Sequence, residues 1–114
     1  MSILVIGESC RDVYQYGSCS RLCPEAPVPV FQSNLHTETC GGMAKNVHNN
    51  VLSLGTDSDL CTNHNWETIN KIRYVDYRTN YIVIRVDQNE DLYGRVELSN
   101  INFEKYDAVI ISDY

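Results

Sequence analysis

The feature that most constrains the fold is a pair of glycines that leads directly into a helical pattern, over residues 40–55. Gly41 and Gly42 allow positive φ angles and a close approach of the backbone to a ligand. In the residues that follow, apolar side chains recur at spacings of three and four, which places them on one face of a helix. Gly55 stands where helices commonly stop. The stretch therefore predicts a tight turn followed by a helix that ends before Gly55.

The start of this helix is a candidate binding site. The first turn of a helix carries free backbone N–H groups and the positive end of the helix dipole. Asn46 adds a side-chain amide that both donates and accepts hydrogen bonds. Such a site suits a polyhydroxylated or anionic small molecule. On the motif alone, a glycine-rich loop that only begins a core helix is the favoured interpretation, because short motifs often match by chance.

Two short apolar runs, at 2–7 and 107–112, are typical of buried strands in a parallel sheet. The segment after the first run, 8–12, is predicted to be a loop at the carboxyl end of that strand, where open α/β sheets place their ligands. Asp12 is the candidate residue there, because a carboxylate can accept two sugar hydroxyls. A surface aspartate or a helix cap is the alternative interpretation of Asp12. A further short strand is expected at 57–62.

Four more segments have the composition of strands outside the buried sheet. The segments 14–22 and 28–36 mix apolar and polar residues and have prolines at their borders, which predicts two exposed antiparallel strands. The segments 71–77 and 81–87 are rich in β-branched and aromatic residues and are separated by a three-residue turn, which predicts a β-hairpin. The remaining polar segments are predicted as a loop or single helical turn and as a short helix, at 63–70 and 99–105 respectively.

Length and charge exclude several classes of protein. The 114 residues suffice for one domain with a modest core. Nine basic and fifteen acidic residues give a net charge of −6, which argues against a general affinity for nucleic acid or for acidic membranes. The apolar runs are too short for a signal sequence or a membrane span, so we expect a cytoplasmic protein. The five cysteines form no C-x-x-C pair and are expected to be free thiols.

Two other kinds of chemistry are weaker interpretations. Four side chains have the ligand types and approximate spacing of a zinc site, namely Cys19, Cys23, His36 and Cys40. Unrelated residues on strands are favoured instead, because strand alternation would separate several of them. Four tyrosines could stack on nucleic acid bases, at positions 74, 77, 81 and 93. The acidic net charge favours packing within a sheet or at a subunit interface.

Several sequence blocks, in this order, form a recognisable pattern. The longer blocks are 7–17 (Gly-Glu-Ser-Cys-Arg-Asp-Val-Tyr-Gln-Tyr-Gly), 20–30 (Ser-Arg-Leu-Cys-Pro-Glu-Ala-Pro-Val-Pro-Val) and 41–47 (Gly-Gly-Met-Ala-Lys-Asn-Val). The shorter blocks are Lys-Ile-Arg at 71–73, Arg-Val-Asp at 85–87 and Ser-Asp-Tyr at 112–114. With these blocks the sequence resembles the ribokinase-like sugar kinases, above all the heptose 7-phosphate kinase domain of bifunctional ADP-heptose synthases. The block at 20–30 is too long a match to be expected by chance.

The resemblance implies an α/β fold, with a truncated ribokinase-like three-layer core and an antiparallel β-sheet lid. The implied single domain divides into a core at 1–13, 41–62 and 99–114 and a lid at 14–36 and 71–87. The resemblance also implies a set of substrate-binding residues for a sugar phosphate, namely Asp12, Gly41, Gly42, Asn46 and Arg85. The lid would pair with that of a second subunit, in a homodimer or a larger assembly.

The chain departs from the family pattern in three ways. Only 15 residues, 56–70, separate the helix from the hairpin, where the family has further βα units. The Gly-Ala-Gly-Asp anion hole, the catalytic aspartate and the ATP pocket of the family's nucleotide half are not found. Cys10 and Arg11 replace residues that are small or apolar in the family.

We therefore expect the sugar-site and lid portion of a carbohydrate kinase, not a complete enzyme. No catalytic residue and no metal ligand is expected in this chain, and ATP and Mg²⁺ are expected only if a missing segment is supplied. The alternative function is a non-catalytic structural or interaction module that uses the lid for dimerisation or assembly.

Overall fold

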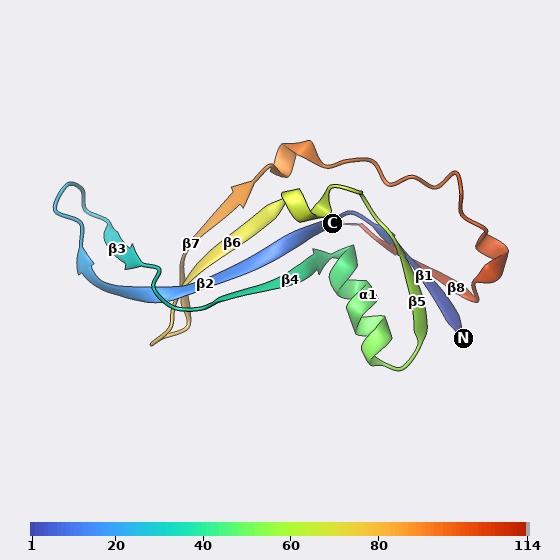
Figure 1. Cartoon of the computed structure of the whole chain (residues 1–114), viewed down its shortest axis with the longest axis horizontal. Helices are drawn as coiled ribbons and strands as arrows, with labels where there is room; N and C mark the ends of the chain where they lie inside the picture. Colours follow the sequence, from blue (N-terminus) through green and yellow to red (C-terminus); the bar gives the residue numbers. More distant parts are fainter. Residues whose placement is uncertain (114) are drawn as a thin grey trace.

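The computed structural model describes residues 1–113 and consists of two sheets joined end to end (Figure 1). The inner sheet has three strands in the order β5-β1-β8, and the outer sheet has five strands arranged around β2. One α-helix, α1, packs against the inner sheet. The predicted mixed α/β fold class is confirmed.

The inner sheet is parallel, as predicted for the runs at 2–7 and 107–112. Its strands are β1 (Ser2–Gly7), β5 (Asp57–Cys61) and β8 (Ala108–Ser112), and both β5 and β8 pair with β1 in parallel. β1 lies in the centre, which explains its continuous apolar sequence, because a central parallel strand is covered on both faces. The other two strands form the edges of this sheet.

The helix α1 (Ala44–Ser53) covers one face of the inner sheet. Ala44 and Val51 on the helix and Val5 on β1 form its buried apolar cluster. Ala44, Val47 and Val51 thus face the sheet, as the spacing of three and four predicts. The fourth residue of that predicted face, Leu54, lies beyond the end of the helix and is 82% exposed. Gly55 follows the helix with a φ of +80°, a left-handed conformation that favours glycine, so the predicted helix stop is confirmed.

The outer sheet is longer and mixed. Its strands are β2 (Ser9–Leu22), β3 (Pro29–Gln32), β4 (Thr37–Met43), β6 (Asn70–Asp76) and β7 (Tyr81–Gln88). β2 pairs antiparallel with β3 and β4, and β6 pairs antiparallel with β7, so the predicted hairpin is confirmed.

One feature of the outer sheet corrects the sequence prediction. β2 and β6 run parallel, so the sheet is not wholly antiparallel. The connectivity gives the reason. β2 follows β1 and β6 follows β5, and both β1 and β5 end at the carboxyl edge of the inner sheet, so both outer strands leave the core in the same direction.

The expected loop at 8–12 and the expected tight turn at Gly41 and Gly42 are both wrong. β2 begins at Ser9, and β4 pairs with it from Thr37 to Met43, so Asp12 and both glycines lie within strands. Neither glycine has a positive φ. The positive φ angle belongs to Met43, whose φ is 58° and which joins the end of β4 to the start of α1.

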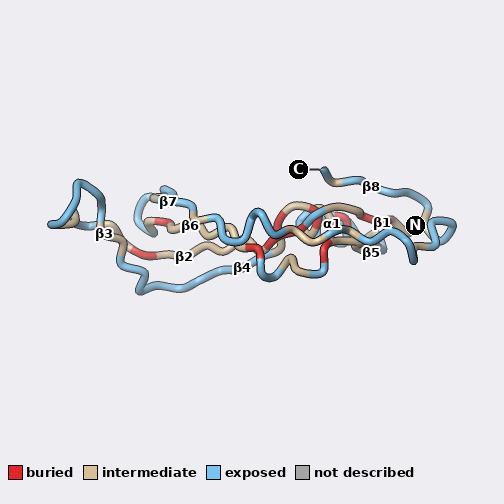
Figure 2. Tube along the Cα trace, turned by 90° about the horizontal axis from the view of Figure 1, so that it is seen from above, coloured by how far each residue is buried: buried red, intermediate tan, exposed pale blue. Residues whose placement is uncertain are grey.

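Three short 3₁₀ turns complete the described chain, η1 (Trp66–Thr68), η2 (Glu90–Leu92) and η3 (Phe103–Lys105). η1 is the single helical turn predicted in 63–70, and η3 occupies only the end of the helix predicted at 99–105. The molecule is elongated, with extents of 61 × 30 × 18 Å, and the outer sheet extends away from α1 as a thin layer (Figure 2). None of the helices in residues 1–113 is long and apolar enough to cross a membrane.

Candidate functional site

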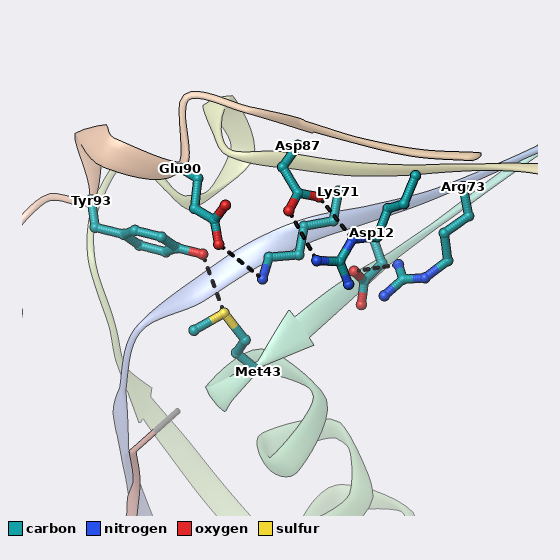
Figure 3. Close-up of polar contacts among 8 residues, drawn as sticks. Asp12, Met43, Lys71, Arg73, Asp87, Glu90 and Tyr93 are labelled. Carbon is teal, nitrogen blue, oxygen red and sulfur yellow. Dashed lines mark hydrogen bonds and ion pairs between the residues drawn. The ribbon is translucent and has the colours of Figure 1, made fainter.

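The candidate site lies where β2, β4, β6 and the start of α1 meet (Figure 3). Asp12 on β2 is in register with Cys40 on β4 and with Lys71 on β6. Residues in register place their side chains on the same side of a sheet, and residues two apart along a strand share a face. By this rule five charged side chains lie on one face, which we call the polar face: Asp12, Lys71, Arg73, Arg85 and Asp87.

Asp12 and Arg73 form the most buried ion pair of the polar face. The Asp12 Oδ1 atom is 2.9 Å from Arg73 Nη1, and each side chain is only 19% exposed. The Arg73 guanidinium also lies over the ring of Tyr14, at 5.3 Å. Burial disfavours the charged guanidinium, but the hydrogen bond and the charge of Asp12 outweigh burial and raise the pKa of Arg73. Arg73 therefore holds the carboxylate in one orientation.

The other two cations of the polar face are also paired. Lys71 Nζ is 3.6 Å from Glu90 Oε1, which belongs to η2. Arg85 binds Asp87 through two contacts of 3.0 Å, from Nε to Oδ1 and from Nη2 to Oδ2. Figure 3 shows Lys71, Asp12 and Arg73 close together above the start of α1. The polar face thus offers both carboxylate acceptors and cationic donors to a ligand, with its charges balanced internally.

Gly42 leaves the space that the Asp12 carboxylate fills. A Cβ atom at position 42 would lie 2.5 Å from Asp12 Oδ2 and 2.9 Å from Cys10 Sγ. Gly41 faces the opposite side of the sheet, where a Cβ atom would overlap the Lys45 side chain. The two glycines are therefore required for close packing, and not for the positive φ angles that the sequence suggested.

The start of α1 differs from the expectation of free N–H groups. The Ala44 N–H donates to the Glu8 carbonyl at 3.0 Å, and the Lys45 N–H donates to Ser9 Oγ at 2.9 Å. These two donors are therefore already satisfied by the protein. Asn46 is exposed on the first turn, and no hydrogen bond within residues 1–113 joins its side chain to the polar face.

The five predicted site residues are thus only partly brought together. Asp12 and Gly42 are in contact, and Arg85 lies on the same face two strands away. Gly41 faces the opposite side of the sheet, and Asn46 is exposed on the first turn of α1. The arginine that departs from the family pattern, Arg11, has a structural role, since it donates to the Glu67 carbonyl and to Asn70 Oδ1 and fastens η1 to β2.

The thiols beside Asp12 are poor nucleophiles. Burial, followed by the charge of Asp12, raises the pKa of both Cys10 and Cys40. A raised pKa keeps a thiol protonated and unreactive. All five cysteines are free thiols. No group of three or more His, Cys, Asp or Glu side chains in the described part of the chain could hold a metal ion.

Sequence reasoning missed several residues of this site. Lys71 and Arg73 alternate along β6, as Arg85 and Asp87 do along β7, and this spacing of two was the available signal for a shared charged face. Tyr93 gave no local signal. Its hydroxyl contacts Met43 Sδ at 3.3 Å, and burial, followed by the neighbouring Cys10, raises its pKa to about 12.

A hollow separate from the polar face lies at the carboxyl ends of β1 and β8. It has a volume of about 190 Å³ and is bordered by the last residues of both strands and by Val96. Ligands of parallel α/β sheets commonly bind at such an edge. Its acidic residues are Glu8 and Asp113, and none of the described residues that line it is basic. The hollow is therefore less suited to a phosphorylated ligand than the polar face.

Comparison with known proteins identifies relatives of this chain. No family model matches. The bifunctional protein HldE of Aliarcobacter butzleri is 32% identical over 148 residues, an alignment that includes 99% of this chain. The HldE protein of Sulfurimonas denitrificans is 31% identical over 92% of the chain. The HldE protein of Campylobacter concisus is 51% identical over 54% of the chain. The chain is related to the ribokinase-like carbohydrate kinases. This relationship confirms the resemblance found in the sequence.

The relationship covers only a part of each HldE protein. The chain spans 30% of the A. butzleri protein, 23% of the S. denitrificans protein and 13% of the C. concisus protein. The first alignment runs over 148 residues, whereas the chain has 114, so the relative contains residues without a counterpart here. The difference agrees with an internal deletion in this chain relative to that HldE protein.

Two solved structures are similar to the chain. A carbohydrate kinase from Agrobacterium tumefaciens has a TM-score of 0.39 and 13% identity, over 76% of this chain and 35% of that one. A putative sugar kinase from Clostridium perfringens has a TM-score of 0.40 and 14% identity, over 90% of this chain and 37% of that one. We draw no conclusion from likenesses at these scores.

Proposed function

We propose that the chain is the sugar-site and lid portion of a carbohydrate kinase related to HldE, and that its polar face binds a sugar phosphate. The observation that carries the proposal is the placement of Asp12, which is held by Arg73 against the backbone of Gly42 with Lys71 on the adjacent strand. A fixed carboxylate is suited to sugar hydroxyls, and neighbouring Lys and Arg side chains are suited to a phosphate group.

In this proposal each residue has a distinct task. Asp12 accepts hydrogen bonds from sugar hydroxyls, and Arg73 orients the Asp12 carboxylate through the 2.9 Å ion pair. Lys71 and Arg85 bind the phosphate group. Phosphoryl transfer also needs a Mg²⁺-bound nucleotide and a base for the attacking hydroxyl. We propose that ATP and Mg²⁺ are bound by a further segment, and that this chain binds and orients the acceptor.

A titration with heptose 7-phosphate tests the proposal. Asp12→Asn should weaken binding about tenfold or more, because hydrogen bonds to a charged acceptor contribute about 1.5 to 3 kcal/mol. The matched control is Asp57→Asn, since Asp57 is an exposed aspartate on β5, away from the polar face. Isothermal titration calorimetry of the three proteins gives the affinities. Equal affinities for Asp12→Asn and the wild type, or no binding by any of them, would refute the proposal.

A second function, an interaction module, is favoured by the opposite face of the outer sheet. The strand register places five apolar side chains on this face, which we call the apolar face: Val13, Ile72, Tyr74, Ile84 and Val86. Phe31 on β3 packs edge-on against Tyr74, at 5.4 Å between ring centroids. Ile84 is 55% exposed and the other four side chains are only half-buried. Apolar surface that is left partly uncovered in this way commonly marks an interface. We propose that two copies of the chain associate through the apolar face, as a homodimer or within a larger assembly.

A further inference from the structure

A short segment after β7 borders the polar face. Residues 89–94, which we call the strap, contain η2 and bring Glu90 and Tyr93 to the inner end of the site (Figure 3). The carboxylate of Glu90 is paired with Lys71, whose side chain is only 18% exposed. The strap therefore supplies a negative charge to the same cation that we assign to a phosphate group.

The strap is fastened at both ends, by a side chain at its start and by its backbone at its end. Asn89 Nδ2 donates to the Thr68 carbonyl at 2.9 Å, and Asn65 Nδ2 donates to the Leu92 carbonyl at 2.7 Å. Asn65 Oδ1 also accepts the Gly94 N–H at 3.0 Å. These hydrogen bonds hold the strap to the loop before β6. A ligand that takes the place of the Glu90 carboxylate therefore has to move one side chain, and not the strap.

The Lys71–Glu90 pair is the weakest of the three ion pairs on the polar face. The pair between Asp12 and Arg73 is short and largely buried, and Arg85 holds its partner through two contacts of 3.0 Å. The Lys71–Glu90 distance is longer, at 3.6 Å, and the Glu90 side chain is 54% exposed. Exposed single-contact ion pairs contribute little to stability. Lys71 is therefore the cation most easily released to a ligand.

We propose that Glu90 is a displaceable counter-ion of Lys71, which occupies this cation in the empty site and gives way to the phosphate group of the ligand. The inference rests on the proposed function. A phosphate group carries more charge and more acceptor oxygens than one carboxylate, so it competes well for a single ammonium group. Glu90 lowers the affinity for every phosphorylated ligand, and it does not affect a sugar that lacks phosphate.

Glu90→Gln tests this role, because it keeps the size of the side chain and removes its charge. We expect the variant to bind heptose 7-phosphate about two- to fivefold more tightly than the wild type, as the loss of an exposed ion pair predicts. Binding of the unphosphorylated heptose should be unchanged. Glu104→Gln, at an exposed glutamate of η3, is the matched control and should bind both ligands as the wild type does. Calorimetric titration provides both affinities.

A second pair of variants shows whether the gain arises at Lys71. Glu90→Gln in a Lys71→Met background should bind heptose 7-phosphate no more tightly than Lys71→Met alone. If the wild type binds and Glu90→Gln binds no more tightly, the counter-ion role is refuted and the proposed function stands. A gain that persists without Lys71, or that extends to the unphosphorylated sugar, also refutes the role. If neither the wild type nor Glu90→Gln binds, both proposals fail.

Discussion

Asp12, Arg73 and Gly42 form the smallest unit on which the proposed site depends. The carboxylate of Asp12 lies between a guanidinium on β6 and the bare backbone of β4, so its position is set from two sides. Neither neighbour is close to Asp12 in sequence. The orientation of the carboxylate is therefore a product of strand pairing, and it should be sensitive to any added atom at position 42.

Gly42→Ala should disturb both stability and binding. The added Cβ atom meets Asp12 Oδ2 and Cys10 Sγ at distances below van der Waals contact, so the carboxylate must shift from the position in which it pairs with Arg73. We expect a loss of about 1 to 3 kcal/mol in unfolding free energy, typical of overpacking, together with weaker binding of heptose 7-phosphate. Urea denaturation and calorimetry measure the two effects.

The control for this variant is Gly55→Ala, at a glycine with a φ of +80° and open space around it. This change should cost about 1 kcal/mol through the backbone alone and leave ligand binding intact. Wild-type affinity in Gly42→Ala would contradict the packing argument.

His48 should make stability depend on pH. The side chain is buried against the inner sheet, with Nδ1 3.1 Å from Ser58 Oγ, and burial, followed by the charge of Lys45, lowers its pKa below the ordinary 6.5. The unfolded chain then binds a proton at a higher pH than the folded chain. Stability is therefore full above about pH 6.5 and decreases as pH falls from there toward the lowered folded-state pKa.

Urea denaturation between pH 5 and 7.5 measures this dependence. His48→Gln removes the titrating group, so its unfolding free energy should change less over this range than that of the wild type. The opposite slope in the wild type, with stability rising as pH falls through 6.5, would contradict a lowered pKa at His48.

At the scale of elements, the junction between β4 and α1 holds one residue in a strained conformation. Met43 has a φ of 58° and a ψ of −125°, which residues with side chains rarely adopt. The contact of its sulfur with the Tyr93 hydroxyl helps to hold it there. This conformation turns the backbone sharply, so the helix starts in a different direction from the strand that precedes it.

Two substitutions at position 43 separate the strain from the contact. Met43→Ala and Met43→Gly both lose the contact with Tyr93, but only glycine adopts the conformation without strain. We expect Met43→Gly to be more stable than Met43→Ala by about 1 to 2 kcal/mol in urea denaturation, which is the size of a single strained residue. Equal stabilities would mean that the backbone at this position relaxes at little cost.

The sequence predicted the elements whose signals are local. The apolar run of 2–7 predicted the buried strand β1, the spacing of apolar residues predicted α1, and the β-branched residues of 71–87 predicted the hairpin. The strand β4 was missed because Gly41 and Gly42 have no side chains to show alternation, and because its partner β2 lies far away in sequence. A glycine pair before a helix also fits a turn, which was the wrong interpretation here.

The candidate site was predictable to a smaller extent. Asp12 and Gly42 were singled out by their places in the sequence and Arg85 through the family resemblance, and the structure places the three on one face or in contact. Glu90 and Tyr93 belong to a polar segment without periodicity, so only long-range packing brings them to the site. The parallel pairing of β2 with β6, which aligns Asp12 with Lys71, is likewise invisible to local patterns.

At the scale of the whole molecule, the chain exposes apolar surface on both sheets. On β8, Ile111 is 75% exposed, and Val109 is also uncovered, although parallel sheets are normally covered on both faces. Beyond its inner end, the outer sheet has no α-helix on either face within residues 1–113 (Figures 1 and 2). Both features fit a chain that works together with further polypeptide.

The isolated chain should not consume ATP. Its proposed task is to bind and orient the sugar, and the nucleotide, Mg²⁺ and the base are assigned to a further segment. A coupled assay for ADP release with purified chain, ATP, Mg²⁺ and heptose 7-phosphate should stay at the rate of the buffer control. Release of ADP that depends on the sugar phosphate would contradict the division of tasks between this chain and a further segment.

The purified chain should form a dimer or a larger assembly in solution. Sequence analysis alone offers Ile72, Tyr74, Ile82 and Ile84 as candidates for the interface, and the strand register now divides them. Ile84 is in register with Tyr74 on the apolar face. A register shift between Tyr74 and Val75 interrupts the alternation and brings Ile82 into register with Val75, so Ile82 lies on the other face although it is only two residues from Ile84. Multi-angle light scattering at micromolar concentration should give at least twice the 13.0 kDa mass of one chain.

Ile82 and Ile84 provide a matched pair of variants, because both lie on β7 and both are 55% exposed in the single chain. Ile84→Glu places a charge on the apolar face and should shift the particle toward 13.0 kDa, because burying an unpaired carboxylate in an interface is costly. Ile82→Glu adds the same charge to the opposite face and should leave the assembly intact. Dissociation by Ile82→Glu alone would show that the interface lies on the polar face of the sheet, where a second copy of the chain would compete with the ligand. A wild-type particle of 13.0 kDa would exclude self-association at that concentration.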